Sequence, residues 1–142
     1  MAIVEVMGAR VAYQVDGRGP GLVLVHGTGA DSQSNWGHLV GQLAEQWTVV
    51  RPDYSGSGKT QDNGEALTIE MLAGQVMAAA GAAAAAPYDL VGYSLGAAVA
   101  ACIAAEYPQQ VRSLVLLAGA VSGRDSRMQV QFGLWRDLIR TD

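Results

Sequence analysis

The stretch LVGYSLGA, Leu90 to Ala97, decides the fold of this 142-residue chain. An apolar run leads into it from Tyr88, and a long alanine-rich run follows it. This order predicts a buried strand, a sharp turn at Ser94 and then a helix. A serine lifted out on such a turn has strained backbone angles, so the residues two before and two after it must be small. Gly92 and Gly96 meet that requirement.

The spacing Gly92-x-Ser94-x-Gly96 between a strand and a helix is the pattern of a nucleophile elbow, in which a serine hydroxyl attacks a carbonyl group. The N-terminus of the helix places partial positive charge beside the reacting oxygen. The same spacing also occurs by chance in glycine-rich chains, and this chain has 18 glycines. Its place between a strand and a helix favours the elbow, with Ser94 as the nucleophile.

A second glycine-rich turn, HGTG at 26–29, follows the apolar run GLVLV at 21–25. That run predicts a strand covered on both faces, and the turn can direct a backbone N–H towards the serine. Acyl transfer needs two such donors, one from this loop and one from the residue after the nucleophile. We therefore predict an oxyanion hole formed by the backbone amides of Thr28 and Leu95. His26, at the end of a buried strand, is expected to hold the loop by hydrogen bonds rather than to act as a base.

A third segment, RPDYSGSGKT at 51–60, ends like a phosphate-binding P-loop, G-x-x-x-x-G-K-[ST]. The leading glycine of that motif would fall at Asp53, where a carboxylate repels a phosphate. The residues that follow, QDNGEA, form a polar loop pattern, whereas a P-loop continues into a helix. The segment therefore does not predict nucleotide binding.

Strand patterns surround these motifs. AIVEV and RVAYQV, at 2–6 and 10–15, predict an antiparallel hairpin. WTVVRPD at 47–53 predicts a further strand, and VRSLVLLAG at 111–119 predicts another buried strand.

Helix patterns alternate with these strands. Apolar residues recur at helical spacing from Trp36 to Trp47, with Ser34 or Asn35 available as N-cap. A second helix follows its N-cap Thr68, and we expect the alanine run and proline at 82–87 to extend it and then stop it. A final amphipathic helix is marked by four large apolar residues: Met128, Phe132, Trp135 and Ile139.

This alternation after an N-terminal hairpin predicts an α/β fold with a mostly parallel, doubly wound sheet. Half of the residues are apolar and 15% are charged, which fits a globular domain. The net charge of −4 and the scattered basic residues indicate no nucleic-acid surface. The single cysteine, Cys102, excludes an intramolecular disulfide framework. No signal peptide is evident and the uncharged run at 71–88 is weakly hydrophobic, so we expect a cytoplasmic protein without a membrane span.

The hairpin and the segments LVHGTG, RPDYSGSGKT, LVGYSLGA and VRSLVLLAG together resemble the α/β-hydrolase family over essentially the whole chain. The resemblance implies that residues 1–122 are the N-terminal part of the hydrolase core, without its last strands, and that 123–142 begin a lid or cap. It implies that Asp53 and the loop Gly56-x-Gly58 shape the edge of the sheet near the pocket. It also implies a small-molecule ester or related acyl substrate, no cofactor and no metal. Ala97 stands where the family often has glycine, and alanine is still small.

One departure from the family pattern concerns the catalytic triad, which occurs in the chain order serine, acid, histidine in this fold. No histidine follows Ser94, and the two histidines of the chain, His26 and His38, both precede it. His38 lies on the helix near Trp36 and is not favoured as the base. Asp125 is the one acid after Ser94 near a place where the family sometimes puts its acid. We therefore expect an incomplete serine hydrolase that is weakly active as this chain.

Two other functions are compatible with the same residues. The fold can serve as a binding or receptor protein that uses its pocket without turnover. It can also be an assembly module, because an uncovered VRSLVLL strand at 111–117 would present a flat apolar edge to another chain. A homodimer through that edge is the partner that this alternative predicts.

Overall fold

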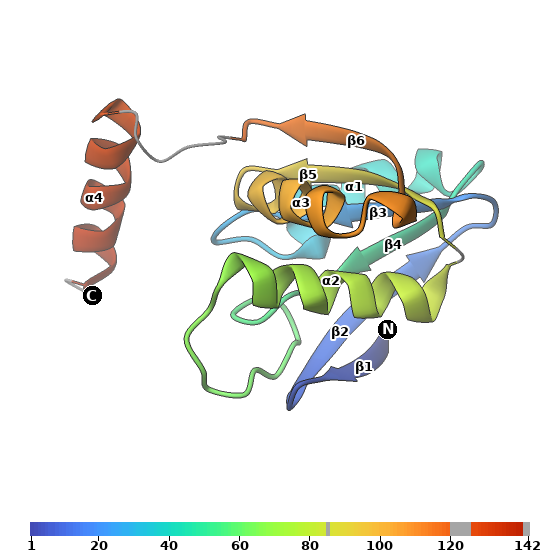
Figure 1. Cartoon of the computed structure of the whole chain (residues 1–142), viewed down its shortest axis with the longest axis horizontal. Helices are drawn as coiled ribbons and strands as arrows, with labels where there is room; N and C mark the ends of the chain where they lie inside the picture. Colours follow the sequence, from blue (N-terminus) through green and yellow to red (C-terminus); the bar gives the residue numbers. More distant parts are fainter. Residues whose placement is uncertain (85, 120–125, 141–142) are drawn as a thin grey trace.

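The computed structural model describes residues 1–84, 86–119 and 126–140. Within them, six strands form one sheet in the order β1-β2-β4-β3-β5-β6 (Figure 1). The first two strands are antiparallel to their neighbours, and the other four run parallel to one another. This confirms the predicted fold class. The strands are β1 (Ala2–Val6), β2 (Ala9–Asp16), β3 (Gly21–Val25), β4 (Thr48–Pro52), β5 (Tyr88–Tyr93) and β6 (Val111–Leu117).

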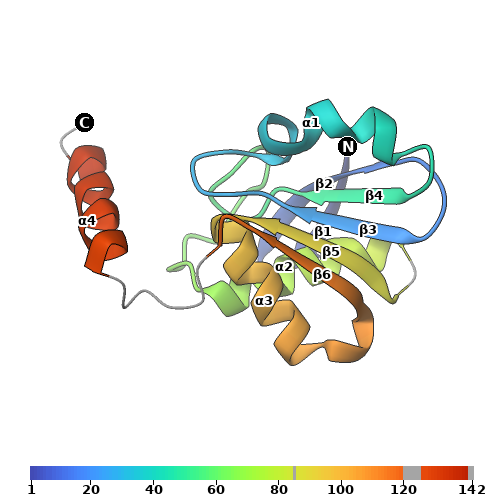
Figure 2. The ribbon, with the colours of Figure 1, turned by 90° about the horizontal axis from the view of Figure 1, so that it is seen from above.

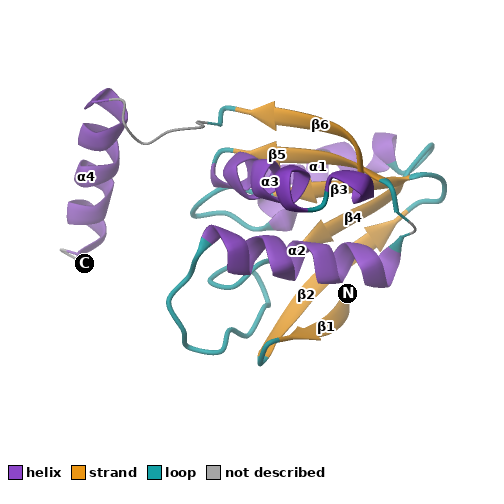
Figure 3. Cartoon of the chain, viewed as in Figure 1, coloured by secondary structure: helices purple, strands orange, loops and turns teal. Residues whose placement is uncertain are grey.

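Helices lie on both faces of the sheet. Figure 2 shows α1 on one face and α2 and α3 on the other. A short 3₁₀ helix at Pro108–Gln110 leads from α3 into β6. The figures draw α4 away from the sheet (Figure 3). The α-helices are α1 (Ser32–Leu43), α2 (Ile69–Ala83), α3 (Leu95–Glu106) and α4 (Ser126–Arg140).

The central strand β3 separates two hydrophobic clusters. Val23 and Val25 belong to the larger cluster, which packs against α2 and α3. Leu22 and Leu24 belong to the smaller cluster, which includes Trp36 of α1. All five residues of β3 are buried. A strand covered on both faces has no polar side, and this explains the continuous apolar run in the sequence.

The first helix begins earlier than its apolar spacing predicts. Asp31 is the N-cap, and its carboxylate accepts a hydrogen bond from the Ser34 backbone N–H at 2.7 Å. The Ser34 hydroxyl oxygen accepts one in return from the Asp31 N–H at 3.0 Å. The predicted N-caps Ser34 and Asn35 are therefore wrong, because this reciprocal pair caps the helix three residues upstream. The helix ends at Leu43, so Trp47 lies outside it and packs beside the smaller cluster.

The second helix begins where predicted and ends sooner. The Thr68 side chain accepts a hydrogen bond from the Met71 N–H at 3.1 Å, which confirms the N-cap. At the other end Ala84 has an extended backbone, so the helix stops at Ala83 and does not reach Pro87. The chain has to turn there to bring Tyr88 into β5, and this tertiary requirement overrides the helix propensity of alanine.

β6 differs from the prediction of a buried strand and agrees with the alternative prediction of an uncovered apolar edge. β6 pairs with β5 and with no other strand of the described chain. Its residues from Leu114 to Leu117 are 37% to 46% exposed. The sequence pattern of β6 is that of a strand covered on both faces, whereas in this structure it forms the edge of the sheet.

None of the helices that the structure describes has the length and apolar character needed to cross a membrane.

Candidate active site

Ser94 occupies the turn between β5 and α3 in a strained conformation. Its backbone angles are φ 55 and ψ −117, outside the regions that a serine ordinarily adopts. A Cβ on Gly92 would collide with the carbonyl oxygen of Gly96. A Cβ on Gly96 would collide with the carbonyl oxygens of Val25 and His26. The two glycines are therefore required by close backbone packing, as the motif predicts.

Hydrogen bonds hold this turn in place. The Ser94 N–H donates to the Leu117 carbonyl at the end of β6, at 2.9 Å. The Ala97 N–H donates to the Ser94 carbonyl at 2.9 Å. Leu95 is the first residue of α3, so the helix itself offers no carbonyl to its N–H. Ser94 itself is half-buried and lies at the N-terminus of α3, where the helix dipole is positive.

The HGTG turn lies against Ser94. Val25, the last residue of β3, pairs with Gly92 of the parallel strand β5, so both turns leave the sheet at the carboxyl ends of their strands. A Cβ built on Gly27 would lie 3.2 Å from the Ser94 Cβ. Thr28, the next residue, is exposed. The structure thus brings together the two glycine-rich turns that the sequence singled out.

Asn35 holds the HGTG turn from α1. Its side-chain oxygen accepts a hydrogen bond from the Gly27 backbone N–H at 2.8 Å. Sequence reasoning considered Asn35 only as an N-cap and missed this contact. The sequence did contain a signal for this contact. Asn35 lies in the first turn of the helix that follows the glycine-rich loop, and its amide side chain can bind the backbone of that loop.

His26 holds the same turn from the protein interior. It is fully buried, and its ring stacks on Tyr54 with 4.0 Å between ring centroids. Nδ1 lies 2.9 Å from the Gly27 carbonyl oxygen, and Nε2 lies 2.9 Å from the Ser57 hydroxyl. The Tyr54 hydroxyl donates to the His26 carbonyl at 2.7 Å. Both ring nitrogens are engaged, in agreement with the structural role predicted for this histidine.

Burial is the main cause of the shifted pKa values of His26 and Tyr54. Desolvation lowers the pKa of His26, although the bond to the Gly27 carbonyl and the nearby carboxylates of Asp53 and Asp31 act in the opposite direction. The imidazole is therefore neutral at pH 7. Burial also raises the pKa of Tyr54, so its hydroxyl stays protonated and donates. Both groups thus hold the turn through hydrogen bonds.

In the segment that resembles a P-loop, side chains of the segment itself bind the backbone groups around it. Asp53 is buried and accepts a hydrogen bond from the Ser32 N–H at 2.8 Å, at the start of α1. Gly58, with φ 52, lies so close to the Asp53 carboxylate that a Cβ there would collide with it. The Thr60 hydroxyl donates to the Asp53 carbonyl and accepts from the Ala12 N–H at 2.9 Å. The carboxylate thus braces the loop against α1.

The remaining candidates from the sequence are His38 and Asp125. His38 is exposed on α1 and lines a cavity of about 320 Å³ together with Tyr93, the residue before Ser94. Asp125 lies outside the described residues. Within the ranges that the structure describes, no group of three histidine, cysteine or acidic side chains could hold a metal ion.

Comparison with known proteins agrees with the observed fold. The family model described as alpha/beta hydrolase fold matches residues 20–139. The chain is 61% identical, over 139 residues, to the pyrrolizixenacetamide deacetylase of Xenorhabdus hominickii, covering 98% of this chain and 52% of that protein. It is 34% identical over 114 residues to the pimeloyl-[acyl-carrier protein] methyl ester esterase of Aliivibrio salmonicida, covering 80% and 41%. A hydrolase from Pseudomonas aeruginosa has a TM-score of 0.82 at 24% identity, covering 94% and 51%, and shows the same fold.

The chain spans about half the length of the deacetylase, and less of the esterase. The family match includes both glycine-rich turns and Ser94. The relatives named as deacetylase and esterase support a hydrolase class for this protein. The chain belongs to the alpha/beta hydrolase fold family.

Proposed function

We propose that this protein is a serine hydrolase that cleaves a carboxylic ester or a related acyl bond through an acyl-enzyme at Ser94. The observation that carries the proposal is the strained Ser94 turn, with the HGTG turn packed against it. Such backbone strain is characteristic of functional sites. A serine in this setting is the attacking group of the nucleophile elbow.

The reaction begins when the Ser94 Oγ attacks the substrate carbonyl carbon and its proton passes to a general base. The carbonyl oxygen becomes an oxyanion, which accepts hydrogen bonds from the backbone N–H groups of Thr28 and Leu95. Collapse of this intermediate breaks the bond to the alcohol or amine, which takes the proton from the base. Water then attacks the acyl-enzyme in the same way, releasing the carboxylic acid and restoring the Ser94 hydroxyl.

The general base belongs, in this proposal, to a part of the protein outside the 142 residues. His26 is unsuited because both of its ring nitrogens bind neighbouring groups beneath the turn. The deacetylase relative is about twice as long as this chain, which leaves room for an acid and a histidine. Without a base the Ser94 hydroxyl stays protonated and is a poor nucleophile at neutral pH.

The relatives also favour a class of acyl group. The 61% identical relative is named as a deacetylase, and the stretch that matches it includes Ser94 and the HGTG turn. We therefore propose a short acyl group, such as acetyl, carried on an amine or an alcohol. The relative named as a methyl ester esterase supports cleavage of the bond between a carbonyl carbon and an ester oxygen.

The test joins this chain to the part of the Xenorhabdus deacetylase that it does not match, as a single hybrid protein. Hydrolysis of p-nitrophenyl acetate and labelling by a fluorophosphonate report on the nucleophile. Ser94→Ala should abolish labelling and lower turnover on the order of a thousandfold or more, because the attacking group is lost. Ser126→Ala, which removes a hydroxyl at the start of α4, should leave both unchanged. A labelled, active Ser94→Ala hybrid would exclude the mechanism.

A further inference from the structure

The HGTG turn is held through its carbonyl groups as well as by Asn35. The His26 carbonyl accepts a hydrogen bond from the Tyr54 hydroxyl at 2.7 Å, and the Gly27 carbonyl oxygen lies 2.9 Å from His26 Nδ1. The Gly27 carbonyl and the Thr28 N–H belong to one planar trans peptide group, so they point in opposite directions. A donor at the Gly27 carbonyl therefore fixes the direction of the Thr28 N–H, which binds the oxyanion in the proposed reaction.

The contact at the Gly27 carbonyl requires a proton on one particular ring nitrogen of His26. A carbonyl oxygen can only accept a hydrogen bond, so Nδ1 has to carry the hydrogen. His26 is fully buried and neutral at pH 7, and a neutral imidazole has a single N–H. Nε2 is then an acceptor. Because the hydrogen bond at one ring nitrogen decides whether the other is protonated, the group that faces Nε2 controls the contact with Gly27.

Ser57 is the group that faces Nε2. Its hydroxyl oxygen lies 2.9 Å from His26 Nε2 and 2.6 Å from the Tyr54 carbonyl oxygen. These two contacts and the one at Gly27 would need three hydrogens, whereas a neutral imidazole and one hydroxyl supply two. The Tyr54 carbonyl has another donor, the Ser57 backbone N–H at 3.1 Å. All three acceptors are therefore satisfied only when the Ser57 hydroxyl donates to Nε2.

A tight turn places Ser57 beside His26. The bond from the Ser57 N–H to the Tyr54 carbonyl closes a four-residue turn, whose third residue, Gly56, has φ 88. Gly58 follows with φ 52, so glycines with positive φ flank Ser57, which is half-buried. The family resemblance concerns these two glycines, whereas the contact with His26 comes from the residue between them.

We propose that Ser57 is a positioning residue for the oxyanion hole. Its hydroxyl donates to His26 Nε2 and keeps the ring proton on Nδ1. The Nδ1–H holds the Gly27 carbonyl, and the Thr28 N–H on the other side of that peptide group is thereby directed to the substrate oxygen. The proposal rests on the reaction proposed at Ser94. Because the oxyanion forms only after the attack, Ser57 should affect kcat and not KM.

The first test follows the ring proton in the 142-residue chain and needs no catalytic activity. At about pH 7.5 the ¹⁵N resonances of the ring, assigned by their loss in His26→Gln, should show a protonated Nδ1 and an unprotonated Nε2. Ser57→Ala removes the donor to Nε2, so part of the population should move its proton to Nε2 and the Thr28 amide resonance should shift. Ser57→Thr keeps a hydroxyl and should restore both. A proton on Nε2 in the unmodified chain overturns the proposal, and so does full retention of the Nδ1 proton in Ser57→Ala.

The second test measures hydrolysis of p-nitrophenyl acetate by the hybrid protein that joins this chain to the unmatched part of the Xenorhabdus deacetylase. An oxyanion forms in both the acylation and the deacylation step. Ser57→Ala should therefore lower kcat about tenfold or more and leave KM within about twofold. Ser57→Thr should restore kcat. An unchanged kcat in Ser57→Ala overturns the proposal.

Thr60→Val is the matched control, because the Thr60 hydroxyl braces the same loop through Asp53 and Ala12 rather than through His26. It should lower the stability towards urea and leave kcat unchanged. An equal fall of kcat in Thr60→Val would show that loosening the loop suffices, which overturns the proposal. If instead the Ser94→Ala hybrid remains active, the proposed reaction fails, while the ring proton in the first test still decides whether Ser57 sets the tautomer.

Discussion

Ser94 is held in a conformation that opposes its own backbone preference. A non-glycine residue in a sparsely populated region costs about 1–3 kcal/mol. The surroundings offset this cost through the hydrogen bond from the Ser94 N–H to Leu117 and through the packing of Gly92 and Gly96 against carbonyl oxygens. The position of the hydroxyl therefore depends on β6 as well as on the strand and helix that flank it.

His26 should make the stability of the chain depend on pH. Burial lowers the pKa of His26 in the folded state, whereas in the unfolded chain it has its ordinary value of about 6.5. As the pH falls below that value, the unfolded state binds a proton that the folded state resists, so the free energy of unfolding decreases. His26→Gln should remove this part of the decrease. Urea unfolding at about pH 7.5 and about pH 5.5 measures the difference.

The pH range from about 7.5 to about 5.5 lies above the pKa values of the carboxylates whose hydrogen bonds stabilise the fold. Hydrogen bonds from Ser34 lower the pKa of Asp31, and those from Arg112 lower the pKa of Asp89, so both titrate at more acidic pH. His38→Gln is the control, because His38 is exposed on α1. The unmodified chain and His38→Gln should lose stability alike. Equal loss in His26→Gln would show that His26 does not carry the effect, and the ¹⁵N resonances of its ring report the same titration without a mutation.

At the scale of the elements, two helices contain glycines in opposite surroundings, one open and one tightly packed. Gly74 lies within α2, and a Cβ there meets nothing within 4 Å. Gly96 lies in the first turn of α3, where a Cβ would collide with the Val25 and His26 carbonyl oxygens. Helix propensity alone would favour alanine at both positions.

We expect the two alanine substitutions to change stability in opposite directions. Gly74→Ala should stabilise the chain by about 0.5–1 kcal/mol, because alanine loses less backbone entropy in a helix. Gly96→Ala should destabilise it by about 1–3 kcal/mol, because the added methyl group overpacks the contact between α3 and β3. The midpoint of urea unfolding measures both. A stabilising Gly96→Ala would mean that the helix and strand are not packed as closely as described.

At the scale of the whole molecule, Arg51 joins the sheet to the α1 layer. It is buried in β4 and donates to Gln33 of α1 at 3.1 Å. It also donates to Gln14 and Asp16 of β2, at 2.9 Å and 2.8 Å. A guanidinium group can serve three acceptors at once because its donors are fixed in a planar fork.

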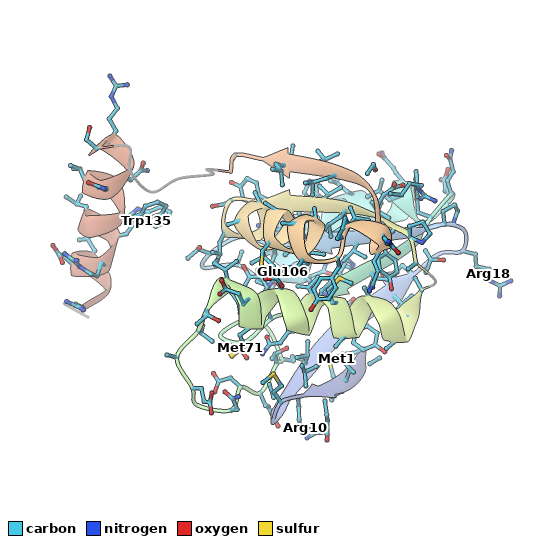
Figure 4. The ribbon with its side chains drawn as sticks, viewed as in Figure 1. Met1, Arg10, Arg18, Met71, Glu106 and Trp135 are labelled. Carbon is cyan, nitrogen blue, oxygen red and sulfur yellow. The ribbon has the colours of Figure 1, made fainter. Side chains whose placement is uncertain are left out.

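Arg51→Ala should destabilise the chain by about 2 kcal/mol, because it leaves polar groups of both layers without their donor. The cost is moderated because the Asp16 side chain is 40% exposed and water can solvate it. Arg18→Ala is the control, since Arg18 extends into solvent (Figure 4), and should change stability by less than about 0.5 kcal/mol. Urea unfolding of the two variants is the measurement. Equal effects would show that the network of Arg51 contributes nothing beyond an exposed arginine.

The amino-acid sequence by itself determined the hairpin, the alternation of strands and helices, and the glycine positions around Ser94. These follow from local causes: apolar periodicity specifies each element, and the steric limits of a sharp turn require glycine at set distances from the serine. The N-cap of α2 at Thr68 is predictable for the same reason, because a cap bonds within one turn of its own helix.

Only the tertiary structure decided which distant groups meet and which remain uncovered. Asn35 reaches Gly27, and Asp53 reaches Ser32, through packing between elements that no local pattern encodes. VRSLVLL has the pattern of a buried strand, yet β6 lies at the edge and leaves a groove beside Trp36. Periodicity reports how apolar a face is, whereas exposure depends on whether another segment lies against that face.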